Sequence, residues 1–241
     1  MIYSSIGYYS LIFGLIISFP IFFFSIINFR NEEALDYRIV SFSFIQLFLV
    51  VLSFLGLVFS FIYSDFSNET VFNNSHTTKP LFYKISGTWG NHEGSLLLWL
   101  VVLTLFIFLF LIKSKDLLKK YRILTVLFQQ IIIIGFFVFL IKSSNPFNYI
   151  FPVPDEGLGL NPILQDPALA IHPPVLYLGY VGSSIIFSSV LAATTLNYIS
   201  KTWAIHIKNW VLVSWIFLTL GILLGSIWAY YELGWGGFWF W

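Results

Sequence analysis

LLLWLVVLTLFIFLFLI, the stretch Leu96–Ile112, decides the fold of this chain. It contains no charged residue, and it lies between Glu93 on its N-terminal side and Lys113 directly after it. An α-helix crosses the hydrocarbon core of a bilayer with about 20 predominantly apolar residues, and about 17 are sufficient. The stretch therefore predicts a membrane-spanning helix.

Five further apolar stretches of this kind lie on either side of it, at about Ile6–Asn28, Ile39–Tyr63, Ile123–Ile141, Val175–Tyr198 and Trp210–Tyr231. Of the 241 residues, 58% are hydrophobic and 10% are charged, whereas soluble domains carry about 25% charged residues. We therefore predict an all-α, polytopic membrane protein with about six transmembrane helices, forming a single membrane domain over residues 1–241. The 28 phenylalanines are typical of an AT-rich genome, such as that of an organelle.

Composition and motifs exclude several classes of function. The net charge of +1 gives no basic surface for nucleic acid, and the absence of cysteine excludes disulfides, thiolate metal sites and thiol exchange. The sequence has no phosphate-binding loop and no nucleophile motif, so it gives no support to an ATPase or a hydrolase. Ion-conducting proteins usually place ionisable residues within their helices, and these six stretches are nearly free of them.

The basic residues of the loops predict the orientation. Nine of the twelve Lys and Arg residues fall on one side of the predicted bundle, and only Lys79, Lys84 and Lys142 fall on the other. The side rich in basic residues should be the cytoplasm or the mitochondrial matrix. Both termini, the loops at about 64–95 and 142–174, and the C-terminal aromatic stretch then share the outer face, towards the periplasm or the intermembrane space.

The first outer loop ends in GTWGNHEG, residues 87–94, directly before the stretch quoted above. Trp89, His92 and Glu93 have two readings here. They form either a capped helix start with an interfacial tryptophan, or the polar lip of a binding site. One histidine and one glutamate do not complete a metal ligand set, which argues against a metal site.

The second outer loop contains His172 directly before Pro173 and Pro174. Because proline restricts the residue before it to extended conformations, we predict that His172 lies in a rigid extended segment at the mouth of the fifth helix. A single loop histidine is either a hydrated surface residue or a ligand, and imidazole is an axial ligand of haem iron.

The chain closes with ELGWGGFWFW, residues 232–241. Its indole rings offer rigid apolar faces with one N–H donor each, and its glycines let the backbone lie close to a partner. This composition predicts either a shelf for a large flat ligand or an aromatic belt at the membrane interface. Gly221 and Gly225 precede it in a Gly-x-x-x-Gly spacing, which lets another helix approach closely.

Four segments in order resemble CcmF, the haem-lyase membrane subunit of the multi-component cytochrome c maturation pathway. They are WGNHEGSLLLW (89–99), LNPILQDP (160–167), HPPVLYLGYVG (172–182) and WAYYELGWGGFWFW (228–241). The likeness covers the chain from the first outer loop to its end. The last segment is similar to part of the tryptophan-rich WWD motif of haem-handling membrane proteins.

The resemblance implies roles for individual residues. His172 corresponds to an outer-face histidine that ligates haem iron. The surface that cradles the haem then comprises Trp235, Gly236, Gly237, Phe238, Trp239 and Trp241, although many relatives have tryptophan in place of Phe238. Lys84 and His92 are candidates for the haem propionates by placement alone.

The resemblance also implies a function and partners. The family binds b-type haem at the outer face, receives it from a haem chaperone, and joins it to the Cys-x-x-Cys-His thiols of apocytochrome c. The family's motif continues beyond Trp241, and a second outer histidine and haem-binding transmembrane histidines should follow there. We therefore expect an N-terminal portion of split-gene type in the mitochondrial inner membrane, inactive without a complementary CcmF-type chain. The alternative location is a bacterial cytoplasmic membrane.

Two readings without haem remain. In the first, the chain is a transport subunit whose aromatic stretch is only an interfacial belt. In the second, it is a structural assembly subunit that docks a catalytic partner through the face carrying Gly221 and Gly225.

Overall fold

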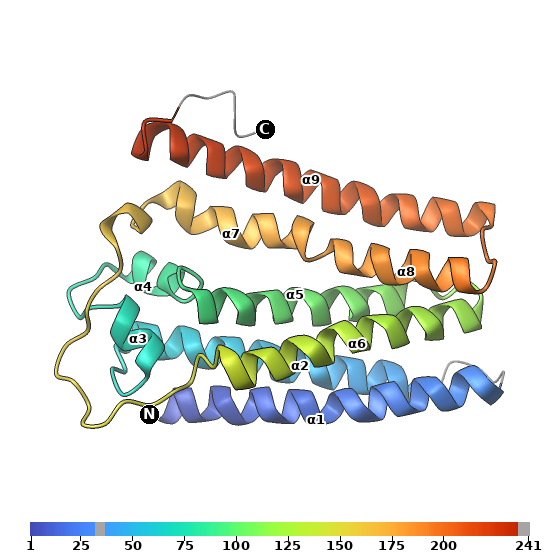
Figure 1. The fold of residues 1–241 in the computed structure, drawn as a ribbon, viewed down its shortest axis with the longest axis horizontal. Coiled ribbons are helices and arrows are strands. Elements are labelled where there is room, and N and C mark those ends of the chain that lie inside the picture. The colour runs from blue at the N-terminus through green and yellow to red at the C-terminus, as the bar shows by residue number, and fades with distance from the viewer. Residues whose placement is uncertain (32–36, 236–241) are drawn as a thin grey trace.

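The computed structural model describes residues 1–31 and 37–235, and within them the fold is a bundle of long helices (Figure 1). Six segments are long and apolar enough to cross a membrane, with α7 and α8 counted as one span. The predicted all-α architecture with about six spans is confirmed. The long helices are α1 (Ile2–Asn31), α2 (Tyr37–Ile62), α5 (His92–Lys113), α6 (Lys119–Ser143), α7 (Pro167–Tyr180), α8 (Ser183–Thr195) and α9 (Lys201–Glu232).

The short elements all lie at one end of the bundle, together with the N-terminus and the C-terminal end of α9 (Figure 1). They are α3 (Glu69–Asn74), α4 (Leu81–Gly87) and the 3-10 turn η1 (Pro162–Leu164). This end, called the loop end below, is the one predicted to face outward. The compartment that it faces stays a prediction.

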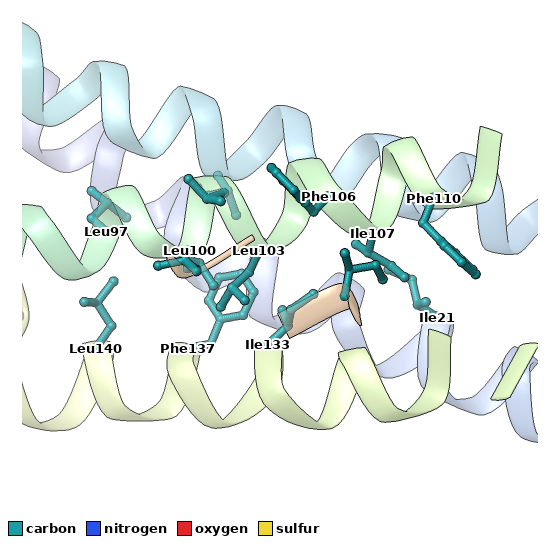
Figure 2. Packing of buried hydrophobic residues seen from close by; sticks show 14 of the residues in the cluster. Ile21, Leu97, Leu100, Leu103, Phe106, Ile107, Phe110, Ile133, Phe137 and Leu140 are labelled. Carbon is teal, nitrogen blue, oxygen red and sulfur yellow. The ribbon is translucent and has the colours of Figure 1, made fainter. Parts of the chain in front are cut away.

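The core is formed by α1, α2, α5 and α6. Leu100 and Leu103 of α5 and Phe137 of α6 are at most 1% exposed, and Figure 2 shows these side chains between the two helices, with Ile21 further along, near Phe110. Close packing of this kind holds transmembrane helices together where water supplies no driving force.

Polar side chains also join the helices inside the core. Gln46 of α2 donates to Ser18 of α1 (2.7 Å), and Gln130 of α6 donates to the side-chain oxygen of Gln46 (3.0 Å). Gln129 of α6 donates to Ser184 of α8 (2.9 Å). Because a polar group in hydrocarbon needs a partner, these bonds favour one arrangement of the four helices.

The fifth span begins at Pro167, so the predicted start at Val175 and the predicted loop as far as residue 174 are wrong. Asp166 caps α7 by accepting a hydrogen bond from the Leu169 backbone N–H (3.0 Å), and proline suits the first helical position that follows. Pro173 and Pro174 lie inside this helix. Pro174 donates no hydrogen bond to the Ala170 carbonyl, and the Trp89 indole N–H takes its place (2.8 Å).

The outermost helix, α9, packs against α7 (Figure 1). A Cβ at Gly221 would lie 2.5 Å from the Cα of Leu176, and one at Gly179 would lie 2.3 Å from the backbone nitrogen of Leu218. The prediction that the Gly-x-x-x-Gly spacing admits another helix is therefore confirmed, and that helix is α7 of the same chain. A partner cannot dock on this face as the assembly-subunit reading requires, because α7 covers it.

Candidate functional site

His172 lies in the second turn of α7, so the prediction of an extended segment around it is wrong. Its half-buried ring faces α9, with Nδ1 2.7 Å from the carbonyl oxygen of Gly221. A carbonyl only accepts hydrogen bonds, so we assign the proton of the neutral imidazole to Nδ1. Nε2 then keeps its lone pair, so Nε2 is the atom that a metal would bind.

Gly225 makes room for this ring. A Cβ there would lie 2.7 Å from Cε1 of His172 and 2.9 Å from Nδ1. Both glycines of the spacing therefore serve the histidine, because Gly221 supplies the acceptor and Gly225 supplies the space. The spacing was visible in the sequence, but nothing there showed that a histidine would lie against it.

The end of α9 leads into the tryptophan-rich stretch. Gly234 adopts the left-handed conformation (φ 66°), which glycine adopts without strain, and the chain turns there. Trp235 follows and is 45% exposed. Gly236, Gly237, Phe238, Trp239 and Trp241 lie outside the described residues, so the predicted shelf stays a prediction.

Two indoles bind α7 and the 3-10 turn before it to neighbouring segments. Trp89 donates to the Ala170 carbonyl, as described above, and Trp228 of α9 donates to the Ile163 carbonyl (3.4 Å). The helix that carries His172 is thus held at Ala170 by a residue between α4 and α5, and the turn before this helix is held by α9. Trp228 belongs to a quoted motif, but the sequence alone gave it no role.

A cavity of about 510 Å³ lies between the start of α5 and the face of α7 that carries Ala170, Pro173 and Tyr177. Its walls include Trp89, His92, Trp99, Pro173 and Tyr177. The cavity is mostly apolar, with a rim of polar groups from the 86–95 segment. Within the described part of the chain, the buried Ser86 hydroxyl and the Trp99 indole N–H have no hydrogen-bond partner, so both remain available to a ligand.

The structure brings only some of the predicted site residues together. Trp89 and His92 share the 510 Å³ cavity, as the lip reading requires. Asn91 caps α5 by accepting a hydrogen bond from the Gly94 backbone N–H (2.8 Å), as the reading of a capped helix start expects, and the role of this lip in binding a ligand stays a prediction. Glu93 faces a separate polar cavity of about 210 Å³, and His172 does not line the 510 Å³ cavity but bonds to Gly221 of α9.

Charged groups fix the loops around the site. Glu156 accepts hydrogen bonds from the Thr77 hydroxyl and backbone N–H and from the Gly157 N–H, and these bonds lower the pKa of its carboxyl group to about 2. Burial, with a smaller contribution from the charge of Lys84, lowers the pKa of Lys79 to about 8. Lys84, the candidate for a propionate, donates to Ser64 (2.8 Å).

Comparison with known proteins places these features in context. A family model described as "Cytochrome C assembly protein" matches residues 89–241. The cytochrome c-type biogenesis protein CycK of Bradyrhizobium diazoefficiens is 53% identical over 196 residues, which are 81% of this chain and 30% of that protein. The cytochrome c-type biogenesis protein CcmF of Escherichia coli is 45% identical over 190 residues, 78% of this chain and 29% of that protein.

A solved structure, "Cytochrome c Heme Lyase CcmF", has the same fold with a TM-score of 0.82. It is 25% identical in sequence, and the match covers 98% of this chain and 38% of that one. The chain therefore spans less than a third of the length of these two curated relatives.

Proposed function

Because this chain belongs to the CcmF family of cytochrome c assembly proteins, we propose that it binds haem at the loop end and presents it for attachment to apocytochrome c. The observation that carries the proposal is the hydrogen bond from Nδ1 of His172 to the Gly221 carbonyl. Histidines that ligate metals commonly donate their other ring N–H to a backbone carbonyl, which fixes the ring and makes the ligating nitrogen more basic.

The residues fit a b-type haem in transit. His172 would hold the iron through Nε2, and the WWD surface, which begins at Trp228 and includes Trp235, would contact the porphyrin face. Haem supplies the vinyl groups to which the two Cys-x-x-Cys-His thiols add. The chain itself supplies position: α9 orients the imidazole, and the adjacent aromatic side chains keep water from one face of the ligand.

Partners follow from the same proposal. A haem chaperone delivers the haem, apocytochrome c receives it, and a complementary CcmF-type chain supplies the second iron ligand. On this proposal the chain alone does not catalyse attachment. Purification in mild detergent should recover the complementary chain, and full activity of a lone monomer would exclude it.

We place the protein in the mitochondrial inner membrane on the strength of its phenylalanine-rich composition, typical of an AT-rich organelle gene. The relatives named above are bacterial, and a bacterial cytoplasmic membrane would accommodate the same helices. Fractionation of the source cells, with detection of the chain by an antibody, distinguishes the two locations.

The deciding experiment is the reduced visible spectrum of the purified chain, with and without any co-purifying partner, beside a His172→Ala variant. We expect most of the haem absorbance to be lost in the variant while its yield from the membrane is unchanged. His76→Ala is the matched control, because His76 is also a histidine at the loop end, and its ring contacts Thr78 and Glu156.

Two other outcomes of this experiment would also distinguish between the proposed functions. Haem in the complex but not in the isolated chain would show a site shared between two polypeptides. No haem in either sample would contradict the proposal and favour the subunit with an interfacial aromatic belt.

A further inference from the structure

A second large cavity lies between α5 and α9, and it opens near the end opposite the loop end. It has a volume of about 490 Å³. Its lining residues recur every three to four positions along one face of each helix, so the cavity is a groove parallel to the bundle. They include Leu105, Leu109 and Lys113 on α5 and His206, Val213 and Phe217 on α9.

Aromatic side chains close the floor of this groove. The ring of Trp210 lies 5.6 Å from that of Phe106 and 6.4 Å from that of Phe110. The ring of Phe110 also meets His206 edge-on at 5.7 Å. These contacts bridge α5 and α9 at depth, and they leave an apolar trough above the floor.

The mouth of the groove is polar and carries hydrogen-bond donors. Lys113 is the last residue of α5 and is exposed, as is Asn209 of α9. Trp210 donates its indole N–H to Nε2 of His206 (2.9 Å), so the proton of the neutral ring is on Nδ1. None of the described residues that line the groove is acidic. A ligand at the mouth therefore meets donors and a positive charge.

The length of the groove matches one leaflet of a bilayer. At 1.5 Å per residue, the lining extends about 12 Å along α5 and about 16 Å along α9, and half of the hydrocarbon core is about 15 Å. A partner helix that spans the membrane would need twice this length. An acyl chain needs only this length, with its head group at the membrane surface.

We propose that this groove binds a phospholipid with an anionic head group. One acyl chain lies between α5 and α9, and the phosphate lies at Lys113 and the Nδ1–H of His206. The mouth is at the end that carries nine of the twelve Lys and Arg residues, the side on which anionic lipids are attracted to basic residues. Helix α9 packs mainly against α7, which leaves a space between α9 and α5. The lipid fills this space.

The test uses the full chain in mild detergent, with native mass spectrometry to measure retained lipid. Phosphatidylglycerol and phosphatidylcholine with identical acyl chains are the two probes. We expect phosphatidylglycerol to be retained preferentially. Lys113→Gln should weaken its binding about fivefold, and Lys142→Gln, which changes an exposed lysine at the loop end, should leave it unchanged.

Val213→Trp tests the acyl chain, because the larger side chain fills the trough without altering the mouth. It should reduce binding of both lipids. Equal binding of the two lipids with no effect of Lys113→Gln would overturn the proposal, as would competition by inorganic phosphate, which would indicate a soluble anion. If the Val213→Trp variant loses a co-purifying chain but retains the lipid, the groove is a docking surface for a helix of that chain instead.

This inference does not depend on the haem proposal. His172→Ala should leave the retained lipid unchanged, and Lys113→Gln should leave the haem spectrum unchanged, so the two proposals fail separately.

Discussion

Gly225 determines whether the imidazole of His172 can lie flat against α9. A Cβ at this position would lie 2.7 Å from the Cε1 atom of that ring. The ring is the part that must move, and its displacement would weaken the bond from Nδ1 to the Gly221 carbonyl. Gly225 and the Gly221 carbonyl are thus positioning groups for the proposed ligand.

Gly225→Ala should therefore weaken haem binding about tenfold to a hundredfold, the usual effect of disturbing a group that orients a metal ligand. The measurement is a haem titration followed by absorbance. Gly135→Ala is the matched control in a transmembrane helix, because no atom lies within 4 Å of a Cβ there, and it should leave binding unchanged. Wild-type affinity in Gly225→Ala would show that the ring orientation does not matter.

At the scale of the element, α7 shows what sequence reasoning can and cannot supply. The apolar stretches predicted the spans because a run of about 20 apolar residues has the length and composition of a helix that crosses the hydrocarbon core of a bilayer. The start of α7 was mispredicted because Pro173 and Pro174 suggested an extended segment, whereas the Asp166 cap and the Trp89 indole stabilise a helix. The Asp166 cap depends on local backbone geometry and the Trp89 bond on a tertiary contact. The local pattern of prolines reveals neither of them.

The placement of the site was predictable only in part, for the same reason. The motifs identified His172 and the cavity residues Trp89 and His92. The absence of His172 from the lining of their cavity depends on which face of α7 meets the glycines of α9. That choice is made by packing between segments about 50 residues apart, so no local pattern encodes it.

Trp89→Phe tests the compensation at the Ala170 carbonyl. The substitution removes the donor that replaces the missing N–H of Pro174, and it leaves a buried carbonyl unsatisfied. We expect a loss of about 1–3 kcal/mol in stability, measured by thermal or denaturant unfolding in detergent. Trp99→Phe is the control: its indole N–H has no partner within the described residues, so it should cost clearly less. Equal losses would mean that ring size, not the hydrogen bond, is responsible.

At the scale of the whole molecule, the loop end is held together by contacts between distant segments. Glu156, from the segment between α6 and η1, accepts bonds from Thr77, which lies between α3 and α4. The carboxyl group has a folded pKa of about 2, below its ordinary value of 4.5. A lowered carboxyl pKa stabilises the contact above about pH 4.5, and that stabilisation is lost as the pH falls towards 2.

Acidification from pH 7 to pH 3 should therefore increase protease cleavage in the segments 75–80 and 144–166. Glu156→Gln should show the increased cleavage already at pH 7 and little further change at pH 3. The neighbouring Asp155→Asn variant serves as the control and should behave as the wild type. Cleavage of the wild type that is independent of pH would contradict the role given to this carboxylate.

The bond between His172 and Gly221 has a consequence for biosynthesis. Because the ribosome makes the chain from its N-terminus, the histidine is synthesised 49 residues before the carbonyl that orients it. The core of α1, α2, α5 and α6 has all its parts before then, but the ligand geometry exists only once α9 is in the membrane. A polypeptide whose synthesis is still incomplete would therefore not sequester haem in an unfinished bundle.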